Sequence, residues 1–309
     1  KEAFLRIVSL LPSATELVCA LGFQQNLVGR SHECDWPLGL SNLPIITQPK
    51  MNPMARAATI DADVRRLVEQ GVSVYMLDAD KLADLAPDVI VTQSQCELCA
   101  VSLDEVETAL KDWMGSHRVP PKLVSLEPMT LDDVMTDIRN LSVALKCEAR
   151  GEALVKEMSL GFKNLAEAVS GEERKSVFFM EWTAPLMGAG NWMPEIISYG
   201  GGDVVLGESG HHSPTVVWDD IHAADPDVII VGPCGFDVER AREELRSLTD
   251  NSSWQSLRAV QDGEVYIANG NHFYNRPGPR LLESAIIIAE ILNPNCVPKI
   301  DNPERWQKW

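Results

Sequence analysis

Four of the seven cysteines share one kind of position, a loop that directly follows a predicted buried strand. Cys34 follows a strand at 27–30, Cys96 and Cys99 follow a strand at 88–92, and Cys234 follows a strand at 227–231. The carboxyl ends of parallel strands lie at one edge of a sheet, where ligands bind, so we expect the four thiols to converge on one cleft. Thiolates gathered in this way hold zinc or an iron–sulfur cluster. Reserve metal ligands lie nearby in the sequence, at His32, Glu33, His211 and His212.

Three other interpretations of these cysteines stay open at this point. Free cysteine is often buried as a small apolar side chain, and the four thiols could be inert. They could also form disulfides. The spacing Cys96-x-x-Cys99 between a strand and a helix is typical of thioredoxin-like redox sites. Here the helix is predicted to begin only at Ser102, so its N-terminus would lower the thiol pKa less effectively.

Aromatic and charged side chains form a second set of candidates, in loops that the predicted fold places around the cleft. A large flat ligand presents an apolar face that aromatic rings can cover, and charged residues can fix its polar edges. Some of these rings could instead cap the cores of the lobes, and Glu181 could pair with Arg276. The candidate ligand-binding residues are Trp36, Glu181, Trp182, Trp192, His272, Phe273, Tyr274 and Arg276.

Motifs of common enzyme classes are missing from the sequence. No Gly-x-Gly-x-x-Gly follows a predicted strand, and no phosphate-binding loop ends in Gly-Lys-Ser or Gly-Lys-Thr. The triplet Gly200-Gly201-Gly202 follows a predicted helix and is interpreted as its stop. We therefore assign no catalytic residue and favour a binding protein over an enzyme.

The elements that must position these residues alternate between strands and helices. Ala86-Pro87-Asp88-Val89-Ile90-Val91 is similar to Asp225-Pro226-Asp227-Val228-Ile229-Ile230, and each strand is followed by a cysteine loop and an acidic helix. Alternating strands and helices predict an α/β protein whose mainly parallel sheets are covered by helices. The repeated pattern predicts two such lobes, with the ligand cleft between them.

A long amphipathic segment separates the two patterns. From Thr130 to about Val169 apolar residues recur at three- and four-residue spacing, without proline, which predicts one continuous helix. We therefore expect an N-terminal lobe at 1–129, a connecting long helix at 130–170 and a C-terminal lobe at 171–309.

Composition and charge restrict the partners. The 309 residues are 45% hydrophobic and 23% charged, as in globular proteins, and the net charge of −18 disfavours nucleic acid and anionic membranes. No apolar run approaches the roughly 20 residues of a membrane span. We expect a monomer. The cysteine content and the lack of a signal in this chain favour the cytoplasm.

Several of these motifs together resemble the cobalamin and ferric-siderophore type of solute-binding protein, in which one long helix joins two lobes. The opening 6–16 and the later Arg276-Pro277-Gly278-Pro279-Arg280 fit the family over nearly the whole chain. The resemblance is closest to a cysteine-rich, cobalamin-binding-like subgroup, through His32 to Asp35, Thr92 to Cys99, Glu181-Trp182 and Pro233 to Phe236. It implies a periplasmic or other extracytoplasmic location, a small-molecule ligand and an ABC permease as partner.

Two functional hypotheses follow. In the first, the protein binds cobalamin or a related corrinoid or metal chelate between its lobes, with a cysteine-ligated metal centre in the cleft. In the alternative, a cysteine-ligated iron–sulfur or zinc centre on the same scaffold is itself the redox or catalytic group. A heme or siderophore carrier is a third reading.

Overall fold

The computed structural model describes residues 4–70, 72–93, 106–108 and 119–309. The chain divides into two compact units, each with its own mainly parallel sheet, which confirms the predicted α/β class. Unit 1 comprises residues 1–55, 59–128 and 132–155, and unit 2 comprises residues 56–58, 129–131 and 156–309. The predicted domain limits at 129 and 171 stay a prediction.

Unit 1 is organised around a parallel sheet with the strand order β2-β1-β5-β6. All residues of β1 and β5 are buried, as expected for central strands covered on both faces. The strands are β1 (Ile7–Ser9), β2 (Leu27–Arg30), β5 (Val89–Gln93) and β6 (Lys122–Leu126), with the antiparallel pair β3 (Thr47–Pro49) and β4 (Tyr75–Leu77) beside them. The helices are α1 (Pro12–Ala20), α2 (Ala57–Glu69) and α3 (Ala79–Leu85), with a 3-10 turn at Gln24–Asn26.

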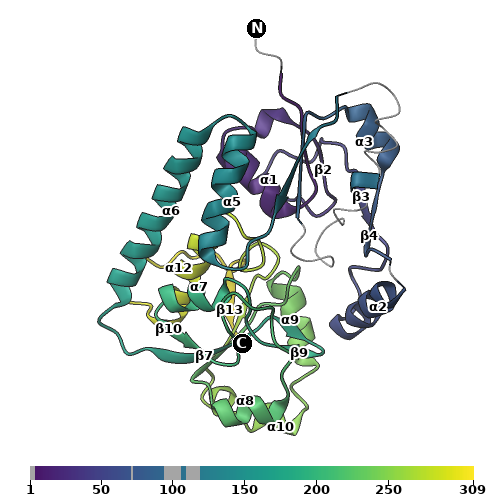
Figure 1. Ribbon diagram of the computed structural model, residues 1–309. Coiled ribbons are helices and arrows are strands. Elements are labelled where there is room, and N and C mark those ends of the chain that lie inside the picture. Colours follow the sequence, from purple (N-terminus) through teal and green to yellow (C-terminus); the bar gives the residue numbers. More distant parts are fainter. Residues whose placement is uncertain (1–3, 71, 94–105, 109–118) are drawn as a thin grey trace. The chain divides into compact units, whose positions relative to one another are not determined.

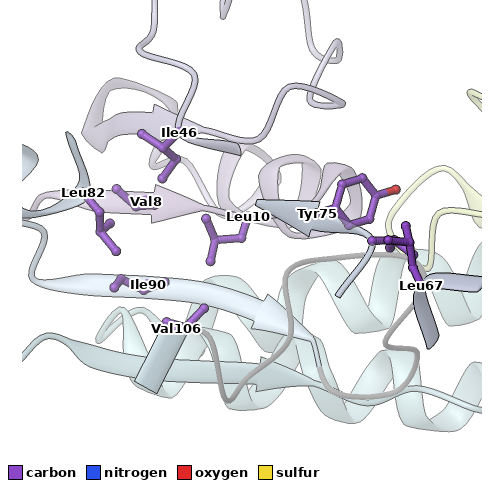
Figure 2. Close-up of a cluster of buried hydrophobic side chains, with 9 residues drawn as sticks. Val8, Leu10, Ile46, Leu67, Tyr75, Leu82, Ile90 and Val106 are labelled. Carbon is purple, nitrogen blue, oxygen red and sulfur yellow. The ribbon is translucent and has the colours of Figure 1, made fainter. Parts of the chain in front are cut away.

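One apolar cluster in unit 1 joins the sheet to the β3–β4 pair (Figure 2). Val8 and Ile90 from the parallel sheet and Ile46 next to β3 are fully buried in it, and Tyr75 of β4 is nearly so. The cluster fixes the β3–β4 pair against the strands of the main sheet. Tyr75 is held in place by this packing.

The single helix predicted over 130–170 is wrong, because the segment forms two helices, α5 (Leu131–Ala144) and α6 (Glu148–Val169). Lys146 adopts a left-handed backbone with φ of 57°. The Cys147 N–H then donates to the Ser142 carbonyl at 2.8 Å, and the Lys146 N–H to that of Val143 at 3.2 Å. This is the Schellman arrangement that ends many helices, normally with glycine at the left-handed position.

The turn at Lys146 brings the end of α5 and the start of α6 side by side within unit 1 (Figure 1). Gly151 faces Ser142 so closely that an added Cβ would lie 2.5 Å from the Ser142 Cβ. Arg139 and Glu152 form an exposed ion pair across the two helices at 2.8 Å. The segment therefore includes a helical hairpin and is not a single straight helix.

Unit 2 contains a sheet in the order β10-β7-β11-β12-β13, in which the first four strands are parallel. Gly200 ends α7 (Met193–Tyr199), as predicted, and it lets α12 (Leu281–Leu292) pack closely on this corner, because an added Cβ on Gly200 would lie 2.5 Å from Ile288. The strands are β7 (Lys175–Met180), β8 (Trp182–Thr183), β9 (Leu186–Met187), β10 (Gly202–Val204), β11 (Val228–Val231) and β12 (Val265–Ala268). The helices are α7 (Met193–Tyr199), α8 (Trp218–Ala224), α9 (Val238–Arg246), α10 (Ser252–Gln255), α11 (Arg258–Gln261) and α12 (Leu281–Leu292).

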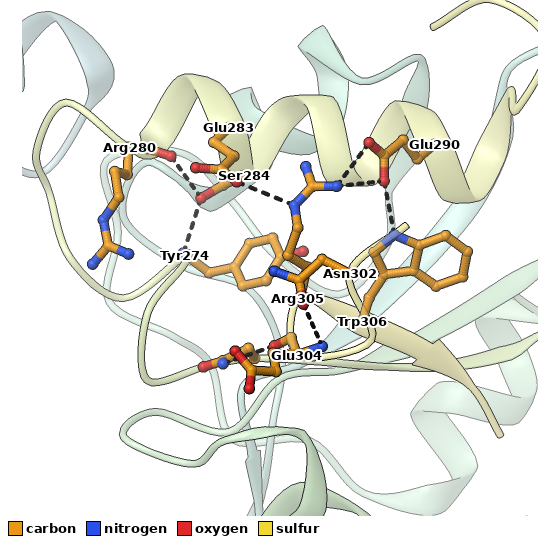
Figure 3. Close-up of polar contacts among 10 residues, drawn as sticks. Tyr274, Arg280, Glu283, Ser284, Glu290, Asn302, Glu304, Arg305 and Trp306 are labelled. Carbon is orange, nitrogen blue, oxygen red and sulfur yellow. Dashed lines mark hydrogen bonds and ion pairs between the residues drawn. The ribbon is translucent and has the colours of Figure 1, made fainter. Parts of the chain in front are cut away.

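The C-terminal segment adds an antiparallel edge strand, β13 (Trp306–Lys308), to this sheet. Buried Arg305 fixes the strand to α12, since its guanidinium contacts Glu283 at 3.1 Å and both oxygens of Glu290 at 2.9 Å (Figure 3). The Trp306 indole N–H also donates to Glu290, at 2.8 Å. The buried charges are therefore paired, as such groups must be to remain ionised away from water.

Candidate functional site

In unit 1, the loop that begins at Ser31 directly follows β2 and lies at the carboxyl ends of β1 and β2. The nearly buried Arg30 side chain supports this loop by donating hydrogen bonds to the backbone oxygens of Leu40, Ser31 and Cys34, at 3.0–3.1 Å. A cation that is paired with three carbonyl oxygens holds the loop in one conformation. The loop residues from His32 to Trp36 therefore have a fixed base at the edge of the sheet.

Cys34 points into the protein at this edge. Its side chain is 1% exposed, and its Sγ lies 3.0 Å from the hydroxyl of Thr15, which is also 2.7 Å from Ser9 Oγ. The sequence prediction placed this thiol at the end of a strand, and it is there. It is, however, enclosed by the first turn of α1 and by β1.

The neighbours of His32 favour its neutral imidazole with the proton on Nδ1. Thr47 donates its hydroxyl proton to Ser31 at 2.9 Å, so its oxygen can accept the Nδ1–H of His32 at 2.7 Å. The lone pair then lies on Nε2, which is buried and has no hydrogen-bond partner among the described residues. Burial, and secondly the charge of Arg30, lower the pKa of His32 below its usual value.

Tyr75 of β4 completes the group around His32. Its hydroxyl donates to Glu33 Oε1 at 2.9 Å, and its ring lies 5.3 Å from the His32 ring between centroids. His32 Nε2 is 3.9 Å from the same Glu33 oxygen. Unit 1 thus presents an imidazole nitrogen, a carboxylate and a phenol close together, with half-buried Trp36 in the same loop.

In unit 2 the ends of three adjacent parallel strands are joined by backbone hydrogen bonds. Beyond β7, the Glu181 carbonyl accepts the N–H of Cys234, which follows β11, at 3.2 Å. Beyond β12, the Gly270 carbonyl accepts the N–H of Gly235 at 3.3 Å. Gly270 must be glycine, because an added Cβ would collide with the carbonyl oxygen of Pro233. This edge is therefore a continuous, fixed surface.

The Glu181 carboxylate is fixed by neutral donors. Ser213 donates its hydroxyl proton to Glu181 Oε2 at 2.7 Å, and the Gly190 N–H also donates to the carboxylate. The side chain keeps some exposed surface, although protein atoms surround the carboxyl group closely. Desolvation by this burial raises the pKa of Glu181 to about 7, and the two hydrogen bonds offset part of the shift.

Next to Glu181, the half-buried Trp182 provides an aromatic surface. Its ring packs edge-on against buried Phe236, with 5.3 Å between centroids and 63° between the planes. The Trp182 indole N–H donates to the Ala184 carbonyl at 3.0 Å, and the Arg240 guanidinium lies 3.6 Å from the Phe236 centroid. The indole is thus held in one orientation by contacts on its edge.

Other predicted ligand-binding residues of unit 2 lie deeper in the fold. Trp192 is 6% exposed and its indole N–H donates to the carbonyl of Tyr274 at 2.6 Å. Tyr274 and Phe273 are buried as well. Buried Arg276 donates to Asn271 at 2.9 Å, so Glu181 and Arg276 have different partners. His272 is half-buried, and its role and those of the buried residues stay predictions.

The described residues give no support to a metal centre. No group of three or more His, Cys, Asp or Glu side chains in this part of the chain could hold a metal ion. Cys96 and Cys99 lie outside the described residues, Cys34 is buried in unit 1, and Cys234 is exposed in unit 2. His211 and His212, the reserve ligands of unit 2, are exposed.

Several neighbours of these groups were not identified from the sequence. Thr47 and Tyr75 lie on β3 and β4, and β3 falls in a proline-rich stretch that has no strand pattern. Ser213 is 32 residues from Glu181 along the chain. Phe236 lies two residues after Cys234, and no local pattern indicates its contact with Trp182.

Comparison with known proteins agrees with the two-unit α/β fold over most of the chain. The vitamin B12-binding protein of Photorhabdus laumondii is 22% identical over 94% of this chain and 89% of its own length. An uncharacterised ABC transporter substrate-binding lipoprotein of Bacillus subtilis is 23% identical over 94% of this chain and 80% of its own length.

Solved structures show the same fold. The periplasmic vitamin B12-binding protein of Vibrio cholerae aligns with a TM-score of 0.65 at 21% identity, over 93% of this chain and 96% of that one. A periplasmic heme-binding protein of Pseudomonas aeruginosa aligns with a TM-score of 0.69 at 19% identity, over 97% and 96%. Among the described residues, no helix has the length and apolar character to cross a membrane.

Residues 7–271 match the sequence profile of the family described as periplasmic binding protein. This match covers most of the chain and includes both strand-end regions described above. Together with the shared fold, it identifies the chain as a member of the periplasmic binding protein family.

Proposed function

We propose that this protein is a solute-binding protein for cobalamin or a related corrinoid. The observation that carries the proposal is the nearly full-length similarity to vitamin B12-binding proteins, one of which matches over 94% of this chain. The similarity extends through both sheets and through the loops at their carboxyl ends. In open parallel sheets this edge is where ligands bind.

The side chains at the strand ends of unit 2 suit such a ligand. A corrin ring presents a broad apolar face and a polar rim. Trp182 offers a partly exposed aromatic surface whose orientation is fixed by Phe236 and by the Ala184 carbonyl. Aromatic rings that are fixed before binding lose little conformational entropy when they cover a flat ligand.

Heme is the competing ligand, because heme-binding proteins share the fold at similar TM-scores. Similarity of fold at such low sequence identity does not choose between the two macrocycles. The idea of a cysteine-ligated centre as the functional group has no support in the described residues. The test therefore compares the binding of two macrocycles, cyanocobalamin and hemin.

A permease partner and an extracytoplasmic location belong to this proposal. The family is a periplasmic one, and a substrate-binding lipoprotein of an ABC transporter is among the relatives. These two findings support delivery of the bound solute to a membrane transporter. Neither of them supports the cytoplasmic alternative.

The proposal is tested by quenching of the intrinsic tryptophan fluorescence with cyanocobalamin and with hemin. We expect saturable binding of cyanocobalamin and at least about tenfold weaker binding by Trp182→Ala, the loss of about 1.4 kcal/mol of stacking energy. Trp309→Ala is the matched control, since Trp309 pairs with Val265 at the opposite end of β12 and should leave the affinity unchanged. Tighter binding of hemin than of cyanocobalamin would overturn the proposal.

A further inference from the structure

The carboxylate of Glu181 has no cationic partner in the described part of the chain. Its hydrogen bonds come from the Ser213 hydroxyl at 2.7 Å and from the Gly190 N–H, and both donors are uncharged. Among these residues, Glu181 forms no ion pair with lysine, arginine or histidine. A carboxylate in a poorly solvated position keeps a strong preference for N–H donors and a strong repulsion for other anions.

The position of this charge is rigid. The Glu181 N–H donates to the Met187 carbonyl at 3.0 Å, and its carbonyl accepts the Cys234 N–H at 3.2 Å. The two donors to the carboxylate are themselves in contact, because an added Cβ on Gly190 would collide with the backbone of Ser213. The carboxylate therefore cannot turn away from an approaching anionic group without breaking these hydrogen bonds.

Glu181 also lies where a ligand would meet it. It directly follows β7, a central strand of the unit 2 sheet, and it directly precedes the aromatic surface of Trp182. Part of its side chain is exposed. A macrocycle that covers Trp182 would bring its rim close to this carboxylate.

From this geometry we infer that Glu181 determines specificity by selecting macrocycles with a rim of neutral amides and rejecting those with a rim of carboxylates. This inference rests on the proposed function and names the feature of the ligand that is recognised. Amide N–H groups can donate to the carboxylate. Carboxylate groups, such as the propionates of heme, are repelled by it and offer no donor.

The test compares cyanocobalamin with each of its monocarboxylic acids, in which one peripheral propionamide is hydrolysed. Affinities are measured by calorimetry at about pH 8, where the carboxyl group is ionised. The wild-type protein should bind at least one of these acids about tenfold or more weakly than cyanocobalamin. In Glu181→Gln, which keeps the shape but replaces one acceptor oxygen by an uncharged NH2 donor, this ratio should fall to within about twofold of one.

Two controls separate charge from shape. Glu173→Gln makes the same change at an exposed position just before β7, and it should keep the wild-type ratio. The second control is the wild-type protein at about pH 6, below the pKa of about 7 of Glu181, where the carboxyl group is mostly protonated and the ratio should fall. This measurement decides the question even if Glu181→Gln fails to fold, which thermal unfolding followed by circular dichroism would reveal.

The inference is overturned if no monocarboxylic acid is discriminated by the wild-type protein, if Glu181→Gln discriminates as well as wild type, or if the wild-type ratio is the same at about pH 6 as at about pH 8. These results leave the proposed function standing as long as cyanocobalamin itself is bound. Tighter binding of hemin than of cyanocobalamin by the wild-type protein would instead overturn both.

Discussion

The hydrogen bonds around His32 favour one protonation state of its imidazole ring. Thr47 gives its own proton to Ser31 and so accepts the Nδ1–H of His32, which leaves the basic lone pair on the buried Nε2. In metal sites, a histidine ligand is often oriented in this way by a hydrogen bond from its other nitrogen. The same kind of hydrogen bond here fixes which nitrogen of His32 carries the proton.

We expect the imidazole of His32 to be the neutral Nδ1–H tautomer at about pH 7, because its pKa lies below the usual 6.5. Thr47→Val removes the acceptor and should give a mixture of tautomers. Nitrogen-15 chemical shifts of the imidazole ring measure this directly, with the signals assigned by their loss in His32→Gln. A dominant Nε2–H tautomer in the wild-type protein would contradict the assigned hydrogen bond.

Asp137 on α5 is a carboxyl group, away from the candidate site, for which the structure predicts a clear pH effect on stability. Its side chain is 8% exposed and accepts the Glu127 N–H at 3.1 Å. Burial, and then the nearby charges of Asp133 and Glu127, raise its pKa to about 7, although the hydrogen bond from Glu127 lowers it. The folded protein thus keeps this proton at pH values where the unfolded chain has lost it.

The stabilising effect of protonated Asp137 should therefore be lost as the pH rises from about 4 to about 7, because the unfolded state binds fewer protons in that window. Asp137→Asn should remove roughly 2–4 kcal/mol of this pH dependence from the free energy of unfolding. Urea unfolding at several pH values measures it, and Asp132→Asn, at an exposed position of the same helix, is the control. Equal slopes for wild type and Asp137→Asn would show that the group titrates normally.

At the scale of elements, the sequence pattern predicted one continuous helix where the structure has a turn between α5 and α6. Apolar residues keep their three- and four-residue spacing through 130–169, and no glycine or proline marks the break. The helix ends at Lys146, which adopts the left-handed conformation. This conformation is sterically unfavourable for any residue with a Cβ. Periodicity alone cannot distinguish one helix from two helices whose apolar faces continue in phase.

Lys146→Gly should stabilise the protein by about 1 kcal/mol, because glycine adopts the left-handed conformation without a steric penalty. Lys146→Ala is the matched control and should bring no such gain, since alanine keeps the Cβ. Thermal and chemical unfolding measure both variants. If glycine destabilised the protein as it does inside a helix, the segment would be continuous in solution.

The elements that the sequence did predict are those whose signal is local. The run at 88–92 became β5 with every residue buried, and the similar run at 227–231 became β11. By contrast, β13 has only three residues and exists because Arg305 is paired with Glu290, 15 positions away on α12. Contacts between residues that are far apart in the sequence leave no local sequence pattern. The hydrogen bond between Ser213 and Glu181 is another example.

On the scale of the whole molecule, each unit positions its candidate residues at the carboxyl edge of its own parallel sheet. Unit 1 contributes the His32, Glu33 and Tyr75 group, and unit 2 contributes Glu181 with Trp182. The net charge of −18 is consistent with a neutral or cationic solute rather than a polyanion. Both edges lie within the region that matches the periplasmic binding protein family.

Isothermal titration of the purified protein with cyanocobalamin tests the central claim most directly. We predict saturable binding of one cyanocobalamin per chain with a Kd of about 1 µM or below. The same titration with hemin should give a Kd at least about tenfold higher. No saturable heat with cyanocobalamin up to roughly 1 mM, or a lower Kd for hemin, would contradict the proposal that this protein binds a corrinoid.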